Sequence, residues 1–221
     1  MVKICGMRDP DNIREILSLS PDWMGFIFHP DSPRQADVER LGPWIAQHEA
    51  VFGGTRRVGV FVRQSPGEIL DITRRMQLHA VQLHGGQSLS FGMKLSNLFR
   101  QHDLPSIRII KVFSIDHGFD FEACVEWEML ADLFLFDTKA AGFGGSGRKF
   151  EWSLLEKYRG SKPFLLAGGI GPTDGPIVHH FIHDQYAGVD LNSRFERAPG
   201  IKDGEKLVAF LKDFKTQKDD K

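Results

Sequence analysis

The sequence predicts an α/β fold, a single-domain (β/α)8 or TIM barrel with a closed parallel sheet. Eight short runs rich in Val, Ile, Leu and Phe are spread along the 221 residues, and several show no polar alternation. Continuous apolar runs are typical of strands that are covered on both faces, as in a parallel sheet. The runs are residues 2–5, 23–28, 57–62, 80–84, 107–113, 132–137, 163–168 and 186–190.

Stretches of helix length separate these runs, and two of them carry clear start signals. Residues 10–19 begin with proline and follow Asp9, which we expect to cap the helix. Residues 65–76 begin with Ser65 and place Glu68 three residues later, the pattern of a capping box. We expect further helices at 88–100, 118–130, 151–158, 173–183 and 203–214, and a weaker one at 36–48, which a Gly-Pro pair interrupts.

Strands that alternate with helices pair in parallel through right-handed crossovers. Eight such units in 221 residues predict a closed barrel, on the compact side for that fold. A doubly wound open sheet is the alternative that the pattern leaves open. No linker or low-complexity tract divides the chain, so we expect one catalytic domain over residues 1–221, with a polar tail that frays from about residue 215 to 221.

Composition restricts the classes of partner. The chain carries 28 basic and 29 acidic residues and a net charge of -1, which gives no general electrostatic case for nucleic acid or an anionic membrane. We expect no secretory signal, and no apolar run approaches the roughly 20 residues that span a bilayer. Cys5 and Cys124 form neither a disulfide framework nor a metal-ligand spacing. We therefore expect a cytoplasmic protein without a bound metal.

In a barrel of this kind, active groups lie at the carboxyl ends of the strands and in the loops that follow them. The chemically unusual residues of the chain stand at these positions. They are Cys5, His29, Arg34, Gln82, His84, Asp137, Gly168, Gly169, Asp190, Asn192 and Ser193. We therefore expect them to surround a functional pocket at this end of the barrel.

Cys5 has two interpretations. Most free cysteines are small buried hydrophobes, which is how we interpret Cys124, in a predicted helix. Cys5 instead ends a strand, and Gly6 leaves room beside it for a ligand. A thiol acts as a base only as thiolate, which needs positive charge nearby. Lys3 points to the same strand face by alternation, and Arg8 is close in sequence.

Asp137 and Arg34 are also open to two interpretations each. Asp137 follows an apolar Phe-Leu-Phe stretch, a setting that suits a carboxyl group to general acid catalysis. It could equally cap a loop or pair with Lys139. Arg34 lies in a loop, where it is either solvated or a bidentate clamp on a substrate carboxylate.

Two glycine-containing loops favour a phosphate site. Residues 167–171 lead from the seventh run into a predicted helix, where exposed backbone N–H groups bind anions. Residues 188–196 follow the eighth run, and phosphate sites after strands seven and eight recur in this fold. Two tight turns are the alternative. We expect the glycine-rich residues 144–147 to form a lid, and they lack the ending of a nucleotide-binding P-loop.

Together these motifs resemble one family. In chain order, KICGMRD, GFIFHPDSPR, VGVFV, VQLHG, FDTKAAGFGGSGRKFEWSLL, FLLAGGI and AGVDLNSRFE are similar to the phosphoribosylanthranilate isomerases of tryptophan biosynthesis, from residue 2 to about 212. The resemblance implies an Amadori rearrangement of N-(5-phosphoribosyl)anthranilate in a (β/α)8 barrel, without metal or organic cofactor. It implies a small phosphoribosyl substrate and leaves open whether the chain is a monomer or a homodimer.

The resemblance also implies roles for single residues. Cys5 corresponds to the general base, Asp137 to the general acid, and Arg34 to the arginine that binds the anthranilate carboxylate. Residues that would hold the phosphate are Gly168, Gly169, Asn192, Ser193 and Arg194, and His84 could contact the substrate. Arg194 stands where many relatives have glycine. A sister aminoaldose–ketose isomerase and a non-catalytic phosphosugar-binding barrel are the competing interpretations.

Overall fold

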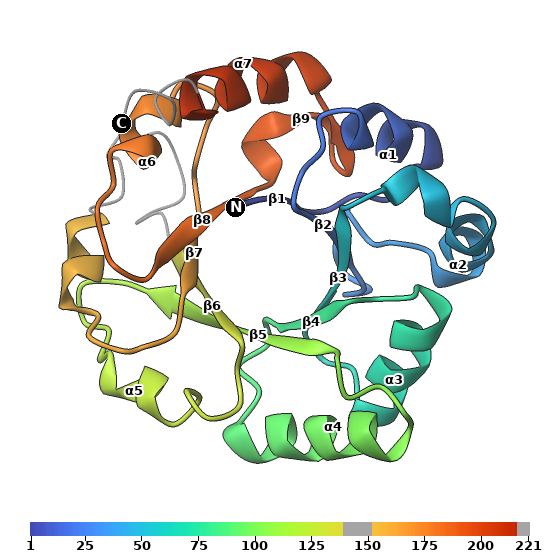
Figure 1. Ribbon diagram of the computed structural model, residues 1–221, viewed down its shortest axis with the longest axis horizontal. Coiled ribbons are helices and arrows are strands. Elements are labelled where there is room, and N and C mark those ends of the chain that lie inside the picture. The colour runs from blue at the N-terminus through green and yellow to red at the C-terminus, as the bar shows by residue number, and fades with distance from the viewer. Residues whose placement is uncertain (139–151, 216–221) are drawn as a thin grey trace.

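The strands form a closed parallel barrel in the order β1 to β8, which confirms the barrel and excludes the open sheet (Figure 1). The structure is a computed structural model and describes residues 1–138 and 152–215. The strands are β1 (Val2–Ile4), β2 (Trp23–Ile27), β3 (Arg56–Phe61), β4 (Ala80–Leu83), β5 (Arg108–Ile115), β6 (Leu133–Thr138), β7 (Phe164–Ala167) and β8 (Tyr186–Leu191). The expected lid at 144–147 and the end of the expected tail, residues 216–221, lie outside the described residues.

Helices lie around the outside of the barrel (Figure 1). They are α1 (Pro10–Leu17), α2 (Val38–Gln47), α3 (Pro66–Arg75), α4 (Leu89–Gln101), α5 (Glu122–Val125), α6 (Gly175–His179) and α7 (Gly204–Lys215). Shorter elements are the 3-10 turns η1 (Glu49–Phe52), η2 (Trp152–Lys157) and η3 (Ser193–Phe195) and a hairpin of β9 (Glu196–Ala198) and β10 (Ile201–Lys202). Within the two described ranges, no helix is long and apolar enough to cross a membrane.

The two expected helix starts are confirmed. The Asp9 side chain accepts hydrogen bonds from the N–H groups of Asp11 and Asn12 at the start of α1. Ser65 and Glu68 form a reciprocal capping box at the start of α3. Each cap satisfies backbone donors that the first turn of a helix leaves without a partner.

The weakly predicted helix at 36–48 forms as α2, with Pro43 inside it. Asp37 caps this helix by accepting from the N–H groups of Glu39 and Arg40. A Cβ at Gly42 would lie 3.1 Å from the backbone oxygen of Arg75. The glycine that weakened the helical pattern therefore allows α2 to approach the end of α3 closely.

Two predicted helices are much shorter than expected, and a third forms as a 3-10 turn. Residues 118–130 form only α5, residues 173–183 form only α6, and residues 151–158 contain the 3-10 turn η2. Around α5 the N–H groups donate mainly three residues back, as Cys124 does to Phe121, which is the tighter 3-10 pattern. These turns place the Phe121 ring 5.9 Å from the Phe136 ring and 6.1 Å from the Tyr158 ring. Aromatic packing thus fills space on this side that longer helices would otherwise cover.

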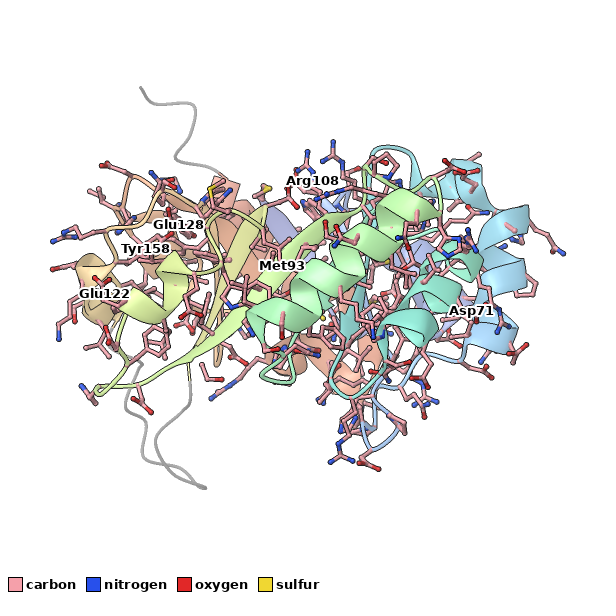
Figure 2. The ribbon with its side chains drawn as sticks, turned by 90° about the horizontal axis from the view of Figure 1, so that it is seen from below. Asp71, Met93, Arg108, Glu122, Glu128 and Tyr158 are labelled. Atoms are coloured by element: carbon pink, nitrogen blue, oxygen red, sulfur yellow. The ribbon has the colours of Figure 1, made fainter. Side chains whose placement is uncertain are left out.

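The two ends of the barrel differ. At the amino end, Arg56 and Arg108 lie over the Trp23 ring, with guanidinium carbons 5.7 and 5.9 Å from its centroid. Figure 2 shows the barrel from the side, with Arg108 at one rim and Met93 on the outer helix layer. Trp23 belongs to the small apolar cluster inside the barrel, which also includes Leu135 and Ala167. The amino end is therefore packed, and the open pocket lies at the carboxyl end.

The barrel closes where β1 pairs with β8, with Lys3 opposite Asp190. Next to this seam, Gly188 has φ of +148°, and a Cβ there would collide with the backbone of Met1. Only glycine fits here, because β8 passes too close to the chain start for any side chain. The seam therefore places the ends of β1 and β8 side by side, which brings Cys5 near the loop after β8.

Candidate active site

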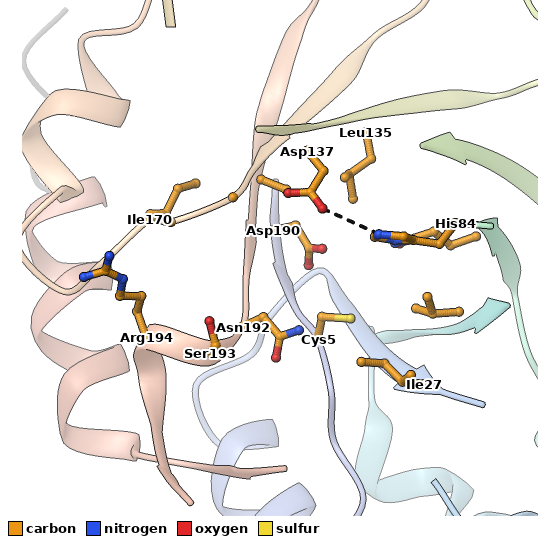
Figure 3. A pocket seen from close by; sticks show the side chains of 15 residues that line it. Cys5, Ile27, His84, Leu135, Asp137, Ile170, Asp190, Asn192, Ser193 and Arg194 are labelled. Atoms are coloured by element: carbon orange, nitrogen blue, oxygen red, sulfur yellow. Dashed lines mark hydrogen bonds and ion pairs between the residues drawn. The ribbon is translucent and has the colours of Figure 1, made fainter. Parts of the chain in front are cut away.

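A pocket opens among the carboxyl ends of the strands (Figure 3). It is lined by Cys5, Ile27, Val60, Gln82, His84, Leu135, Asp137, Ala167, Gly168, Gly169, Ile170, Asp190, Asn192, Ser193 and Arg194. Every site residue expected from the sequence is therefore at this pocket except His29 and Arg34. The strand-end positions predicted this convergence, because the carboxyl ends of parallel strands meet at one rim.

Cys5 directly follows β1 and is 3% exposed. Its N–H donates to the backbone oxygen of Leu191 at 2.9 Å, which continues the β1–β8 pairing. A Cβ at Gly25 on β2 would lie 2.7 Å from the Cys5 sulfur. Gly25 therefore provides the space that the thiol occupies, a requirement that the sequence pattern did not indicate.

Two lysines supply positive charge near the thiol. Burial raises the pKa of Cys5, whereas Lys3 and Lys202 lower it. Lys3 is fully buried and donates to Asp190 Oδ1 at 2.9 Å. Burial opposes the charge of Lys3, but Asp190 and Cys5 together raise its pKa. The expected role of Lys3 thus agrees with the structure.

The second cation expected near the thiol is a different residue. Arg8 is exposed and donates to the Pro33 carbonyl oxygen at 2.8 Å. Lys202, which the sequence analysis did not single out, is fully buried and donates to Asn192 Oδ1 at 2.8 Å. Lys202 lies in β10, far along the chain from Lys3 and Arg8. No local pattern around residue 202 indicates that its side chain contacts Asn192 at the pocket.

Asp137 ends β6 and faces the pocket together with His84 (Figure 3). The Nε2 atom of His84 lies 3.5 Å from Asp137 Oδ2, and its Nδ1 atom lies 3.2 Å from Gln82 Nε2. With Gln82 donating to Nδ1, the Nε2–H group of His84 is directed at Asp137. Lys139, the alternative partner of Asp137, lies outside the described residues.

Gln82 is a pocket residue to which the sequence analysis assigned no role. It is 1% exposed, and its Oε1 atom has no hydrogen-bond partner among the residues that the structure describes. A buried acceptor without a partner is costly. Because Gln82 lines the pocket, a hydroxyl or amine of a ligand could satisfy this oxygen. Its position at the end of a predicted strand placed it among the expected pocket residues, but gave no role to its amide.

The glycines after β7 have the backbone that the phosphate hypothesis needs. Gly168 and Gly169 have φ values of +84° and +68°. A Cβ at Gly169 would contact nothing within 4 Å, so its positive φ rather than crowding favours glycine. The following helix α6 begins only at Gly175, later than expected. The backbone of the loop, more than the helix start, is therefore what faces the pocket here.

Arg194 fits the backbone at the position where the family resemblance implies glycine. It lies inside η3 and is not among the non-glycine residues with positive φ. Its Cδ atom would be 3.9 Å from a Cβ at Gly171, and Figure 3 shows its side chain beside Ile170. The loops after β7 and β8 therefore lie against each other, with an exposed guanidinium at the border.

Arg34 is bound to an internal carboxylate. Its Nε atom lies 2.9 and 3.1 Å from the two carboxylate oxygens of Glu196, and its Nη2 atom lies 2.7 Å from Oε2. These hydrogen bonds raise the pKa of Arg34. The solvated alternative is wrong for this residue, because its side chain is only 21% exposed. Glu196 was not predicted, because it is 162 residues away and lies in a hairpin that no sequence signal marked.

Other groups that can carry chemistry have structural partners. His179, His180 and His183 contact the backbone oxygens of Phe214, Pro176 and Tyr158. Burial raises the pKa of Cys124 to about 12, which fits the structural interpretation of this residue. In residues 1–138 and 152–215, no group of three or more His, Cys, Asp or Glu side chains is placed to hold a metal ion.

Comparisons with known proteins show the family of the chain. The family model described as N-(5'-phosphoribosyl)anthranilate isomerase matches residues 2–213. A protein of that name from Phocaeicola vulgatus is 40% identical over 215 residues, which cover 97% of this chain and 98% of the relative. Another, from Parabacteroides distasonis, is 40% identical over 96% of this chain and 91% of its own length.

Solved structures give the same result. The crystal structure of phosphoribosyl anthranilate isomerase from Thermotoga maritima superimposes with a TM-score of 0.77 at 31% identity, and the match covers 97% of this chain and 98% of that one. A phosphoribosyl anthranilate isomerase solved in complex with reduced 1-(o-carboxyphenylamino)-1-deoxyribulose 5-phosphate has a TM-score of 0.76 at 28% identity, over 97% and 98% of the two chains. The chain therefore belongs to the family of N-(5'-phosphoribosyl)anthranilate isomerases.

Proposed function

We propose that Cys5 and Asp137 are the base and the acid with which this isomerase works. The reaction converts N-(5-phosphoribosyl)anthranilate to 1-(2-carboxyphenylamino)-1-deoxyribulose 5-phosphate, an aldose-to-ketose rearrangement in tryptophan biosynthesis. It requires one proton at the ribose ring oxygen and the removal of another from C2′. The observation that carries the proposal is that Cys5 and Asp137 face one pocket from the ends of β1 and β6.

The first step opens the ribose ring. Asp137 protonates the ring oxygen while the lone pair of the substrate nitrogen moves toward C1′, and the C1′–O bond breaks. The product is a protonated imine, which serves as an electron sink for the next step. His84, 3.5 Å from Asp137, is placed to orient the carboxyl group and to contact the substrate. General acid catalysis requires that the Asp137 carboxyl group lie within hydrogen-bond reach of the ring oxygen of the bound substrate.

The second step removes the proton from C2′. The Cys5 thiolate takes it, the electron pair forms the C1′–C2′ double bond, and the iminium nitrogen is neutralised. The resulting enolamine then tautomerises to the ketone, with a proton added at C1′. Burial makes the thiolate a minor species, and therefore a stronger base, while the ammonium of Lys3 stabilises it.

Binding groups lie at the two sides of this pair. The backbones of Gly168 and Gly169 and the loop from Asn192 to Arg194 are suited to the phosphate. Arg34 is the candidate for the anthranilate carboxylate, with Glu196 already on one edge of its guanidinium. The ligand in the relative's structure carries both a carboxylate and a phosphate, which supports one substrate that spans both sides.

The setting of the enzyme follows from the same features. We expect it to act in the cytoplasm on a small molecule, without nucleic acid or membrane as partner and without a metal or organic cofactor. Cys5 and Cys124 are free thiols, as is usual in a reducing compartment. A Thermotoga maritima relative is described as dimeric, so both a monomer and a homodimer are candidates for this chain.

The test follows the fluorescence of the substrate, generated in place because it is labile. We expect the parent protein to consume it and Cys5→Ala and Asp137→Ala to lose at least about 1,000-fold in kcat, since each removes a proton-transfer group. Cys124→Ala, which removes the other thiol, is the control and should retain activity. Equal activity of Cys5→Ala and parent would show that the base is another residue. If the parent protein is inactive, isomerisation of the related aminoaldose and then binding of phosphosugars would be measured instead.

A further inference from the structure

The hairpin of β9 and β10 carries two buried charges to the edge of the pocket. It follows β8 and lies between α7 and α1 (Figure 1). Asn12 of α1 holds both backbone groups of Lys202, since its Oδ1 accepts from the Lys202 N–H at 2.7 Å and its Nδ2 donates to the Lys202 oxygen at 2.9 Å. The position of the Lys202 side chain is therefore fixed from the helix layer.

From this position Lys202 joins Glu196 of its own hairpin to Asn192, which lines the pocket. Its Nζ atom lies 2.6 Å from Glu196 Oε1 and 2.8 Å from Asn192 Oδ1. The side chains of Lys202 and Glu196 are 0% and 5% exposed. Gly200 also donates its N–H to Glu196 Oε1, at 3.1 Å. The Glu196 carboxylate is thus held by two donors of its own hairpin, Lys202 and Gly200, and by Arg34.

Arg34 uses one edge of its guanidinium for this carboxylate. The Nε and Nη2 atoms contact Glu196 side-on. A guanidinium presents five N–H donors in a plane, so the edge formed by Nη1 and the outer Nη2 hydrogen remains for a second carboxylate. The side-on contact therefore fixes the plane in which this second carboxylate would bind.

The network is also fixed relative to Cys5. Gly6, next to Cys5, has φ of +81°, and a Cβ there would lie 2.7 Å from Asn192 Oδ1 and 3.0 Å from Arg34 Cδ. Arg34, Asn192 and the backbone after β1 therefore pack directly on one another. A shift of the arginine would change its place with respect to the thiol.

Two cations and one carboxylate meet in this network. Buried charge is stable only when it is paired, so Arg34, Lys202 and Glu196 together favour one further anion. We propose that Glu196 is a positioning residue, braced by Lys202, that orients Arg34 for the carboxylate of the substrate. This inference rests on the proposed function, in which Arg34 binds that carboxylate. Glu196 acts through Arg34 and touches no reacting atom.

The decisive variant is Glu196→Asp, which keeps the charge but is one methylene too short for the side-on contact. We expect its KM to rise about 10-fold while kcat stays within about threefold, because the loss is in binding. The dissociation constant of reduced 1-(o-carboxyphenylamino)-1-deoxyribulose 5-phosphate should rise by a similar factor. An unchanged KM would overturn the inference. If Glu196→Asp does not fold, Glu196→Gln is the second variant, because it keeps the side-chain length and one acceptor. The KM of Glu196→Gln should also rise. A lower KM would show that Glu196 only repels the substrate.

The matched control breaks another salt bridge of the same strand. Arg197, next to Glu196, pairs with Glu15 on the surface, and Arg197→Met should leave both constants unchanged. Arg34→Met separates the two proposals. If it leaves KM unchanged, the carboxylate role of Arg34 fails. If it raises KM and Glu196→Asp does not, only the positioning role of Glu196 fails. In the Arg34→Met background, Glu196→Asp should add less than about twofold, since neighbouring groups that act as one unit are not additive.

Discussion

Lys3 and Asp190 are paired twice at the seam of the barrel. They are direct register partners of β1 and β8, and their side chains form an ion pair of 2.9 Å with exposures of 0% and 8%. A buried pair of this kind adds little net stability, but removing one partner leaves an uncompensated charge. Because the Lys3–Asp190 pair lies beside Cys5, the lysine acts on the thiol as well as on the carboxylate.

Lys3→Met should move the pH dependence of catalysis. Burial raises the pKa of Cys5 and Lys3 lowers it, so the pKa of the thiol rises further when the lysine is removed. Because the thiolate is the proposed base, kcat/KM increases as pH rises toward that pKa. The part of the kcat/KM–pH profile that rises with pH should therefore shift to higher pH. At pH 7, kcat/KM should fall at least about 10-fold.

This shift is measured as kcat/KM from pH 6 to 10, with circular dichroism as the check on folding. Lys3→Arg retains the charge and should restore the profile toward its original position. A uniform loss at every pH, with no shift of the profile, would show that Lys3 acts only through the structure of the seam. The variant Lys3→Met/Asp190→Asn should recover part of the stability that the single substitution loses, since it removes both charges of the pair.

Arg194→Gly introduces the residue that the family resemblance implies at this position. The guanidinium borders the two loops that we assign to the phosphate, and it is exposed. An exposed charge at a phosphate site contributes modestly and is screened by salt. We expect KM to rise about threefold to 10-fold at low ionic strength, with the difference from the parent shrinking in about 0.5 M salt. A KM that does not depend on the substitution at any salt concentration would remove Arg194 from the phosphate site.

The strands and the pocket residues were predictable from local composition. Parts of the helix layer were not predictable from it. A strand buried on both faces shows its position in local composition, and its last residues are then placed at the rim by topology. Cys5, His84 and Asp137 were found in this way. The helices at 118–130 and 173–183 were overestimated because the local pattern did not contain the packing of aromatic rings such as Phe121 on Tyr158.

The part of the site that the sequence did not show depends on contacts between distant segments. Arg34 was recognised as a candidate clamp, but its partner Glu196 lies 162 residues away. Lys202 comes from a two-residue strand, too short to leave a periodic signal. Hydrogen bonds of this kind carry no local pattern, because neither residue type nor spacing near Glu196 indicates which side chain it will meet.

Lys111 should give the protein a pH-dependent stability of its own. It is 5% exposed, lies 4.7 Å from the Trp127 ring and donates to the Gln87 oxygen, and burial lowers its pKa to about 8. Between pH 8 and about 10.5, the unfolded chain keeps this proton and the folded chain loses it. The free energy of unfolding therefore gains about 3 kcal/mol from this group as pH rises through that range.

Urea unfolding at pH 7.5, 9 and 10.5 measures this effect as a difference between parent and Lys111→Met. The difference is needed because Tyr158 and Tyr186, whose pKa values are raised by burial, destabilise the fold in the same range. Lys111→Met should be the more stable protein at pH 7.5, and its advantage should shrink as pH rises. Lys94→Met, at an exposed position of α4, is the control and should keep the slope of the parent. Parallel curves for Lys111→Met and parent would show that the amine is solvated.

Gly6→Ala tests whether the backbone beside the thiol must be glycine. The position has φ of +81°, and the added Cβ would meet Asn192 Oδ1 at 2.7 Å and Arg34 Cδ at 3.0 Å. Gly53→Ala is a matched control, since Gly53 also has positive φ but a Cβ there would meet nothing within 4 Å. The control should lose about 1 kcal/mol from the backbone alone, measured by urea unfolding. Gly6→Ala should lose about 2 to 4 kcal/mol and raise KM at least about 10-fold, because it displaces the arginine and the asparagine as well. Equal stability losses in the two variants, with an unchanged KM for Gly6→Ala, would show that Arg34 and Asn192 can move without consequence for binding.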